Sequence, residues 1–369
     1  MTVVALTGRV LWRDQPGAPP AWREGAWIVD GRMTVQAPEA SAIEHVGGYA
    51  VPGLVDVHCH LGYGSDGVTG PDQTLANARK VVESGVLAVR DAGVPERAND
   101  CLIGRDDAPR LIRCGRHIAR PKRYIRGLGV DLADPAQLPD EMARQAAAGD
   151  GWVKIVGDWI DRAEGVNSLL RPLWTPRQLA EGVSRAHAAG ARVAVHAFSA
   201  QAIGPLLDAG VDDIEHGTGM DRAAMRRARA AGVPVTPTLL QVGLFDTFAA
   251  QAGTKYPAYR DQMRAMWTAR RDHFQALLDE GVTLLPGTDS GGYQRFGSLP
   301  DELALWEEYG AAAADVLAFA TWRARDFLGL DSLSEGAPAD VVVYRRDPAA
   351  STSVLAAPAR VYRAGRRLV

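Results

Sequence analysis

Two histidines stand one residue apart at the end of an apolar run, in "PGLVDVHCH" (residues 52–60). If this run is a β-strand, His58 and His60 share one face because successive side chains alternate, and Cys59 points the other way into packing. Two imidazoles on one face can bind one divalent metal ion, although two unrelated polar histidines are the alternative. Asp56 shares this face and could orient His58, but a role in core packing explains its position equally well.

Three more residues of metal-binding type end other apolar runs. His196 lies in "VAVHAF", His216 ends "DDIEH" and Asp289 follows "LLPGT". A lone histidine after a strand is more often structural, but several such residues at separate strand ends together favour a metal site. Glu215, which precedes His216, is expected to face away from the interior and to form a salt bridge.

A lysine lies inside the apolar run "GWVKIVGDW" (151–159). Burying an ammonium group without a partner costs several kcal/mol or removes its charge. Beside metal cations Lys154 would lose its proton easily, and a neutral amine can react with carbon dioxide to give a carbamate, which can bridge two divalent ions. The alternative is a charged Lys154 that reaches solvent or pairs with Asp158 or Asp91.

The elements that must position these residues alternate between short apolar runs and helical or loop segments. Segments 175–190 and 221–232 have helical spacing and end in glycine. This alternation predicts a parallel (β/α)₈ barrel, in which functional residues lie at the carboxyl ends of the strands. A doubly wound sheet is the main competitor, but no glycine-rich phosphate motif follows the first strand. The eight predicted strands lie within residues 50–60, 85–93, 109–115, 151–159, 191–198, 211–217, 233–239 and 282–291.

Composition and charge restrict the class of protein. The chain has 369 residues, of which 47% are hydrophobic and 23% charged, and its net charge of -3 gives no field that attracts nucleic acid or an anionic membrane. We find no segment that could span a bilayer and no signal peptide at the start, and three cysteines do not suggest a disulfide framework. We therefore expect a cytoplasmic protein with a small-molecule substrate and neither a nucleic-acid nor a membrane partner; homo-oligomer formation is left open.

The motifs together resemble those of the metal-dependent amidohydrolases over nearly the whole chain. Residues 191–221, followed by "GVPVTPTL", are similar to the branch that contains imidazolonepropionase-like proteins and Xaa-Pro-type dipeptidases. The resemblance implies a distorted (β/α)₈ barrel at residues 51–326, beside a small β-sandwich that residues 1–50 and 327–369 build together. The motifs that carry it are "PGLVDVHCH", "VKIVGD", "VAVHAF", "IEHGTGMD", "PGTDSG" and "LSEGAPADVVVY".

The resemblance also implies roles for the metal-binding residues. Zinc is the expected ion, given imidazole and carboxylate ligands. Deaminase branches usually hold one metal and lack the strand lysine, so Lys154 argues against a deaminase and against imidazolonepropionase proper. Six ligands are implied: His58, His60 and Asp289 for one ion, His196 and His216 for a second, and carboxylated Lys154, with a hydroxide, as the bridge between the ions.

Such a site predicts a binuclear hydrolase that cleaves a C–N bond in an amide, a cyclic amide or a dipeptide. The metal-bridging hydroxide would attack the polarised carbonyl, and Asp289 would act as general base and then as general acid toward the departing amine. One alternative is a phosphotriester or lactone hydrolase that uses the same metal pair. Another is a non-catalytic scaffold, against which the complete set of ligand positions argues.

The loops after the third and fourth strands differ from those of the dipeptidase branch, and a histidine often found after the last-strand aspartate is missing. Substrate identity is therefore the part of the resemblance that transfers least. The basic segment 116–126 could bind a substrate carboxylate or could simply be solvated. Residues that could contact substrate, or could equally be ordinary packing, are Tyr63, His117, Arg120 and Trp159.

Overall fold

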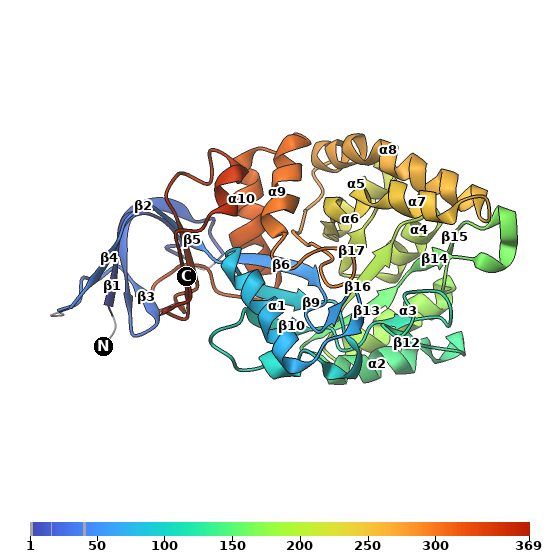
Figure 1. The fold of residues 1–369 in the computed structure, drawn as a ribbon, viewed down its shortest axis with the longest axis horizontal. Helices are drawn as coiled ribbons and strands as arrows, with labels where there is room; N and C mark the ends of the chain where they lie inside the picture. The colour runs from blue at the N-terminus through green and yellow to red at the C-terminus, as the bar shows by residue number, and fades with distance from the viewer. Residues whose placement is uncertain (1–2, 16, 40–41) are drawn as a thin grey trace.

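The structure is a computed structural model that describes residues 3–15, 17–39 and 42–369. Figure 1 shows a β-sheet at one end of an elongated molecule, with both chain termini near it, and a larger body in which helices surround a set of strands. The larger body holds the candidate site.

Strands from both chain ends share one eight-stranded sheet. Its strands pair in the order β21-β20-β19-β5-β1-β2-β3, and β4 pairs with β1. The antiparallel pairing of β5 with β19 sets Pro52 opposite Val341, which joins the two chain ends directly. The strands are β1 (Val3–Trp12), β2 (Ala21–Val29), β3 (Arg32–Thr34), β4 (Glu44–Val46), β5 (Tyr49–Pro52), β19 (Val341–Tyr344), β20 (Arg360–Arg363) and β21 (Arg366–Arg367).

Parallel strands form the centre of the larger body. One sheet has the order β10-β9-β6 and the other the order β12-β11-β13-β16-β17-β18. Apart from β10 and β12, whose residues are half-buried or exposed, these strands are almost entirely buried, as expected where helices cover a parallel sheet. Their bounds are β6 (Leu54–Cys59), β9 (Val86–Asp91), β10 (Arg110–Arg113), β11 (Ile118–Ala119), β12 (Val130–Asp131), β13 (Trp152–Val156), β16 (Arg192–Ala197), β17 (Asp213–His216) and β18 (Val235–Thr236).

The eighth predicted strand, within residues 282–291, differs from the prediction. It makes only isolated parallel bridges, from Leu284 to Val235 and from Ser290 to Cys59. Backbone hydrogen bonds still join this segment to both sides, because Leu285 N donates to Val235 O at 2.9 Å and Val57 N donates to Pro286 O at 2.9 Å. The segment thus lies between β18 and β6, and the arrangement is that of a TIM-barrel-like α/β fold.

Two short hairpins and a layer of helices complete the body. The hairpins are β7 (Tyr63–Gly64) with β8 (Gly67–Val68), and β14 (Asp158–Ile160) with β15 (Leu170–Pro172). None of the helices in the described ranges is both long and apolar enough to cross a membrane. The helices are α1 (Pro71–Glu83), α2 (Leu138–Ala148), α3 (Pro176–Ala188), α4 (Ala200–Ala209), α5 (Arg222–Ala231), α6 (Leu239–Gly243), α7 (Phe245–Ala252), α8 (Pro257–Asp279), α9 (Leu299–Glu308), α10 (Ala313–Ala318) and α11 (Ala324–Phe327), with a π-helical turn at Phe319–Arg323.

Local sequence explains where the helices begin and end. At α3, the Thr175 hydroxyl accepts from the Gln178 N–H at 3.3 Å, and the Gln178 side chain accepts from the Thr175 N–H at 2.9 Å. This capping box satisfies two backbone donors at the start of the helix, and Pro176 follows it in the first turn. Helix α5 ends at Gly232, whose φ of 70° is the left-handed conformation that glycine adopts at low cost.

Candidate active site

The carboxyl ends of four strands and the segment after β18 bring the predicted metal ligands together. His58 and His60 come from the end of β6, Lys154 from β13, and His196 and His216 from the ends of β16 and β17. Asp289 lies in the segment that bridges β18 and β6. Lys154 lies close enough to His58, His196 and His216 for its charge to lower their pKa values.

Asp56 fixes the position of Asp289 through the backbone. Its carboxylate accepts from the backbone N–H of His58 at 3.1 Å and from the Thr288 hydroxyl at 2.7 Å. It therefore joins the end of β6 to the residue that precedes Asp289. The sequence left open whether Asp56 orients the ring of His58. In the structure, Asp56 accepts a hydrogen bond from the backbone N–H of His58 and not from its ring.

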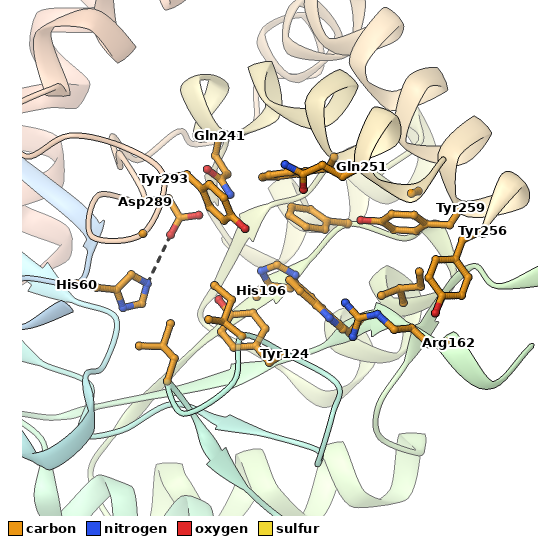
Figure 2. Close-up of a pocket in the computed structure, with 18 residues that line it drawn as sticks. His60, Tyr124, Arg162, His196, Gln241, Gln251, Tyr256, Tyr259, Asp289 and Tyr293 are labelled. Carbon is orange, nitrogen blue, oxygen red and sulfur yellow. Dashed lines mark ion pairs between the residues drawn. The ribbon is translucent and has the colours of Figure 1, made fainter. Parts of the chain in front are cut away.

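His58, His60 and Asp289 form the tightest group of metal-ligand types in the described part of the chain. Their ligand atoms lie within 4.8 Å of one another. Asp289 Oδ1 lies 3.1 Å from His58 Nε2 and 3.5 Å from His60 Nε2, and the latter contact is drawn in Figure 2. Burial would raise the pKa of Asp289, but the neighbouring imidazoles of His58, His60 and His216 outweigh it and hold the pKa well below its usual value. Asp289 is therefore a carboxylate that faces two imidazoles.

His196 and His216 form a second pair beside the first group. His196 Nδ1 lies 3.0 Å from His216 Nε2, and the ring of His58 is centred 5.2 Å from that of His216. The other ring nitrogen of His196 lies 3.8 Å from Asp158, which accepts from the backbone N–H of Phe198 and so anchors the loop after β16. The two nitrogens that face each other could both donate electron pairs to one cation.

Oxygen atoms behind the rings decide which nitrogen faces the site. His60 Nδ1 lies 2.8 Å from the carbonyl oxygen of Gly93, which can only accept, so this nitrogen carries the proton. His216 Nδ1 lies 2.6 Å from the Thr238 hydroxyl, and His58 Nδ1 lies 3.4 Å from a Glu215 carboxylate oxygen. Nε2 of each ring is left to point toward the site, and in His60, whose proton is on Nδ1, it has its electron pair available, which is the arrangement of metal-bound histidines.

Glu215 contradicts the prediction that it faces away from the interior. It is fully buried and forms ion pairs with Lys154 and with Arg90, the latter at 3.1 Å. The reason lies in the next residue: His216 has a φ of 66°, so the backbone leaves the regular strand after Glu215 and strict alternation no longer separates the two side chains. The predicted salt bridge exists, but it lies beneath the candidate site.

Arg90 is a buried residue that sequence reasoning missed. Its guanidinium forms an ion pair with Asp213 and donates to the carbonyl of Val57 at 2.8 Å, and it stacks on Trp152 at 4.3 Å from the ring centre. Together with Glu215, these contacts neutralise the charges below the site. The "VRD" of β9 gave a weak signal, since a charged residue inside an otherwise apolar run needs a partner.

Burial controls the protonation of the basic groups. It lowers the pKa values of His58, His196 and His216 well below the usual value, so these rings are neutral near pH 7. Burial opposes a charge on His60 too, but the hydrogen bond and charge of Asp289 outweigh it and raise its pKa. Lys154 is 1% exposed, and burial lowers its pKa to about 7. Neutral imidazoles and a readily deprotonated amine are the forms that bind cations or react with carbon dioxide.

These side chains fit divalent cations. Both ring nitrogens of His58 are buried and face carboxylate oxygens, of Glu215 at 3.4 Å and of Asp289 at 3.1 Å, so the nitrogen without a proton has no donor to satisfy it. Leaving such nitrogens unsatisfied is costly unless a ligand occupies the space before them. Imidazole nitrogens with one carboxylate are a donor set for zinc and similar ions.

A pocket opens from the site toward α7, α8 and the β14–β15 hairpin. Its volume is about 320 Å³, within the range of small-molecule sites. Figure 2 shows His60, Asp289 and His196 at its floor and side, with Gln241, Gln251 and several aromatic rings around it. The aromatic lining consists of Tyr124, Trp159, Phe198, Phe248, Tyr256, Tyr259 and Tyr293.

The four predicted substrate residues have different positions. Trp159 lines the pocket, and its ring contacts those of Tyr124 and His196. His117 is fully buried behind the pocket wall, with its ring centre 5.8 Å from that of His60. Tyr63 is half-buried in β7 and Arg120 follows β11; in the described chain neither of them, nor His117, is among the pocket-lining residues.

Most lining residues were not predicted, for two reasons. Tyr124 lies in the basic segment 116–126, whose charges drew attention away from its aromatic residue. Gln251, Tyr256 and Tyr259 come from α7, α8 and their connection, where the sequence pattern is that of ordinary helices. Only the tertiary structure places these helices over the ends of the strands.

Solved structures of similar fold span the chain. A Xaa-Pro dipeptidase with bound methionine in its active site aligns with a TM-score of 0.80 and 23% identity, covering 99% of each chain. A prolidase complexed with N-methylphosphonate-L-proline aligns with a TM-score of 0.79 and 20% identity, also over 99% of each chain. Ochratoxinase from A. niger has a TM-score of 0.77 and 19% identity, over 99% of this chain and 95% of its own.

Sequence comparison assigns the family. An uncharacterized protein of Mycobacterium tuberculosis and one of Mycobacterium bovis are each 41% identical over 350 residues, which covers 95% of this chain and 93% of theirs. Residues 49–368 match the amidohydrolase family. This confirms the family predicted from the motifs, in which metal dependence is typical. The chain belongs to the amidohydrolase family and is a hydrolase that acts on carbon–nitrogen bonds.

Proposed function

We propose that the chain is a binuclear metal-dependent hydrolase that cleaves the C–N bond of an amide, a cyclic amide or a dipeptide. One observation carries this proposal: imidazole nitrogens with available electron pairs and the Asp289 carboxylate converge at the floor of an aromatic pocket. The names of the solved relatives, two of which are peptidases for proline-containing substrates, agree with a C–N bond as the target.

Each ligand has a role in the proposal. His58, His60 and Asp289 would hold one ion, and His196 and His216 a second. When bound, the ions would lower the pKa of a water molecule and polarise the substrate carbonyl; zinc is the expected metal. Lys154, in its carboxylated form, would supply the anionic oxygens between the two ion positions, and its burial, which lowers the pKa of the amine to about 7, supports this role.

Asp289 would transfer the proton. Its carboxylate lines the pocket and lies near the imidazoles of His58 and His60, where a water molecule and a substrate amide can both reach it. It would take the proton of the attacking water as general base and return it to the departing amine as general acid. The surrounding aromatic walls exclude bulk water and position the amide.

We also propose that residues 51–326 form a closed (β/α)₈ barrel and that the two chain ends form a separate β-sandwich. The antiparallel pairing of β5 with β19 and the bonds between residues 284–290 and both β18 and β6 support this division. Limited proteolysis is a direct test, and cleavage at the exposed turn that contains Glu335 and Gly336, between α11 and β19, is expected before cleavage within the barrel.

A substrate panel tests the function. Protein supplied with zinc, manganese or cobalt should hydrolyse members of a set of N-acyl amino acids and dipeptides, and a chelator should abolish the activity.

Asp289→Asn should lower kcat by about 10²–10⁴-fold, because it removes the proton-transfer group. Activity only on lactones or aryl phosphotriesters would reject the C–N assignment for this site. A protein that retains no divalent ion and stays inactive after metal addition would be a scaffold.

A further inference from the structure

Arg162 is an arginine at the pocket that has no carboxylate partner. It begins the irregular segment between β14 and β15, is exposed at the pocket mouth, and lines the pocket. Figure 2 shows its guanidinium extending from the rim toward His196. Within the described ranges the Arg162 guanidinium forms no ion pair. It donates one long hydrogen bond, of 3.5 Å, to the carbonyl oxygen of Lys122.

Neighbouring arginines differ in this respect. Arg123 pairs with Asp161 at 2.6 Å, and Arg171 makes two hydrogen bonds to Glu164, at 3.0 and 2.9 Å. The two acidic residues in the segment between β14 and β15 are thus already neutralised by arginines outside the pocket lining. The cation that points into the pocket is left with its donors available for an anion from solution.

A second donor without a partner belongs to Trp159, in strand β14 of the same hairpin. The indole nitrogen of Trp159 is buried, lines the pocket through its side chain, and has no hydrogen-bond partner in the described chain. Tyr259 lies nearby, and burial raises its pKa to about 12 against the opposing charge of Arg162, so its hydroxyl keeps its proton. A buried N–H without a partner costs free energy unless a ligand accepts from it.

The charges of the pocket differ between its two sides. Asp289 is the one carboxylate that lines the pocket within the described residues, and it lies on the opposite side from Arg162 in Figure 2. No lining group matches a free ammonium near Arg162, whereas its guanidinium matches an anion. The aromatic rings between the two sides fit a flat or apolar group.

We propose that Arg162 and the Trp159 N–H form a subsite for a substrate carboxylate, so that the preferred substrate is an N-acylated amino acid with an aromatic or apolar side chain rather than a free dipeptide. This inference rests on the proposed function, since the amide of such a substrate would lie at Asp289 while its carboxylate lies at Arg162. Arg162 is then a specificity residue that comes from the hairpin in which this chain departs from its relatives.

Binding measurements test the subsite separately from catalysis. Calorimetric titration of the metal-loaded protein would compare three probes with one scaffold: 3-phenylpropanoate, 3-phenylpropanamide and 3-phenylpropylamine. The anion should bind at least about tenfold more tightly than the neutral amide, as expected for charge-assisted hydrogen bonds, and the cation most weakly. Arg162→Met should remove this preference, and Trp159→Phe, which keeps an aromatic ring but lacks the N–H, should reduce it.

Arg171→Met is the matched control, because it removes the same charge from the same hairpin but outside the pocket lining. It should leave the anion preference unchanged. Equal binding of the three probes by the unmodified protein, absence of binding, or an anion preference that survives in Arg162→Met would each overturn the subsite. None of these results would affect hydrolysis of uncharged amides, which tests the proposed function by itself.

Discussion

At the scale of single residues, the site depends on which ring nitrogen of each histidine carries its proton. Gly93, Thr238 and Glu215 each hold the Nδ1 side of one ring, at 2.8, 2.6 and 3.4 Å. Both partners in one of these contacts have backbone conformations that non-glycine residues rarely adopt, since the φ of His216 is 66° and that of Thr238 is 45°. Such strain persists only where surrounding contacts over-determine it, as they do here.

Glu215 should therefore act on the metal site through His58. We expect Glu215→Gln to lower the affinity for the divalent ion by about 10–100-fold, because the amide orients the imidazole less strongly and removes a negative charge beside it. Competition with a chromophoric chelator would measure this affinity. A structural role alone would lower the melting temperature without changing the affinity of the folded protein.

Glu302→Gln is the matched control for that substitution. Glu302 is also fully buried and accepts hydrogen bonds from Leu239 N–H at 2.7 Å and from the Trp306 indole at 2.8 Å, but it contacts none of the proposed ligands. The Glu302→Gln protein should be less stable than the unmodified protein but should keep its metal affinity. Equal losses of affinity in the two variants would contradict the role given to Glu215.

At the scale of elements, Arg90 joins three central strands. From β9 it donates to Val57 of β6 and forms ion pairs with Asp213 and Glu215 of β17. The carboxylates are fully buried, so the guanidinium compensates for charges that no solvent reaches. This network holds β6 and β17, which carry His58 and His216, in a fixed relation below the site.

Removing Arg90 should be costly. We expect Arg90→Met to lower the free energy of unfolding by about 3–5 kcal/mol, because two buried carboxylates lose their partner. Arg192→Met is the control, since Arg192 stacks on the same Trp152 ring, at 4.2 Å, but pairs with no carboxylate in the described chain. Its loss should be about 1 kcal/mol. Urea unfolding would measure both, and equal destabilisation would mean that stacking, not charge pairing, is the main contribution of Arg90.

At the scale of the whole molecule, the proposed ligands are distant in sequence and meet only through the fold. His58 and Asp289 are separated by most of the larger body, yet lie 3.1 Å apart. A cation held by such ligands would stabilise the native state alone, because the unfolded chain cannot gather them. Metal binding should thus be a large part of the stability of this protein.

Removal of metal should lower the melting temperature. At a free ion concentration about a thousandfold above Kd, the stabilisation is about 4 kcal/mol, and a shift of roughly 5–10 °C is expected on chelation. Calorimetry with and without chelator, followed by restoration with zinc, would measure it. The variant His58→Asn should respond less to the chelator. An unchanged melting temperature in the unmodified protein would argue against stable metal binding.

Sequence by itself determined the family and the set of metal-binding residue types, because short motifs such as "DVHCH" and "IEHG" place side chains at strand ends through local alternation. It also predicted seven of the central strands, whose apolar runs must be buried on both faces. It predicted that both chain ends are β-rich, and the helix limits followed from caps and glycines.

Tertiary structure decided the rest. Glu215 shares the inward face with Asp213, and the left-handed backbone at His216 brings the His216 ring to the same side, a departure that alternation cannot anticipate. The ion-pair partners of Arg90 lie on strands far away in sequence, and the pocket is closed by Tyr256, Tyr259 and Arg162 from segments whose local pattern shows no function. Local sequence specifies what each element is, whereas which elements meet over the site depends on long-range packing that a single sequence does not reveal.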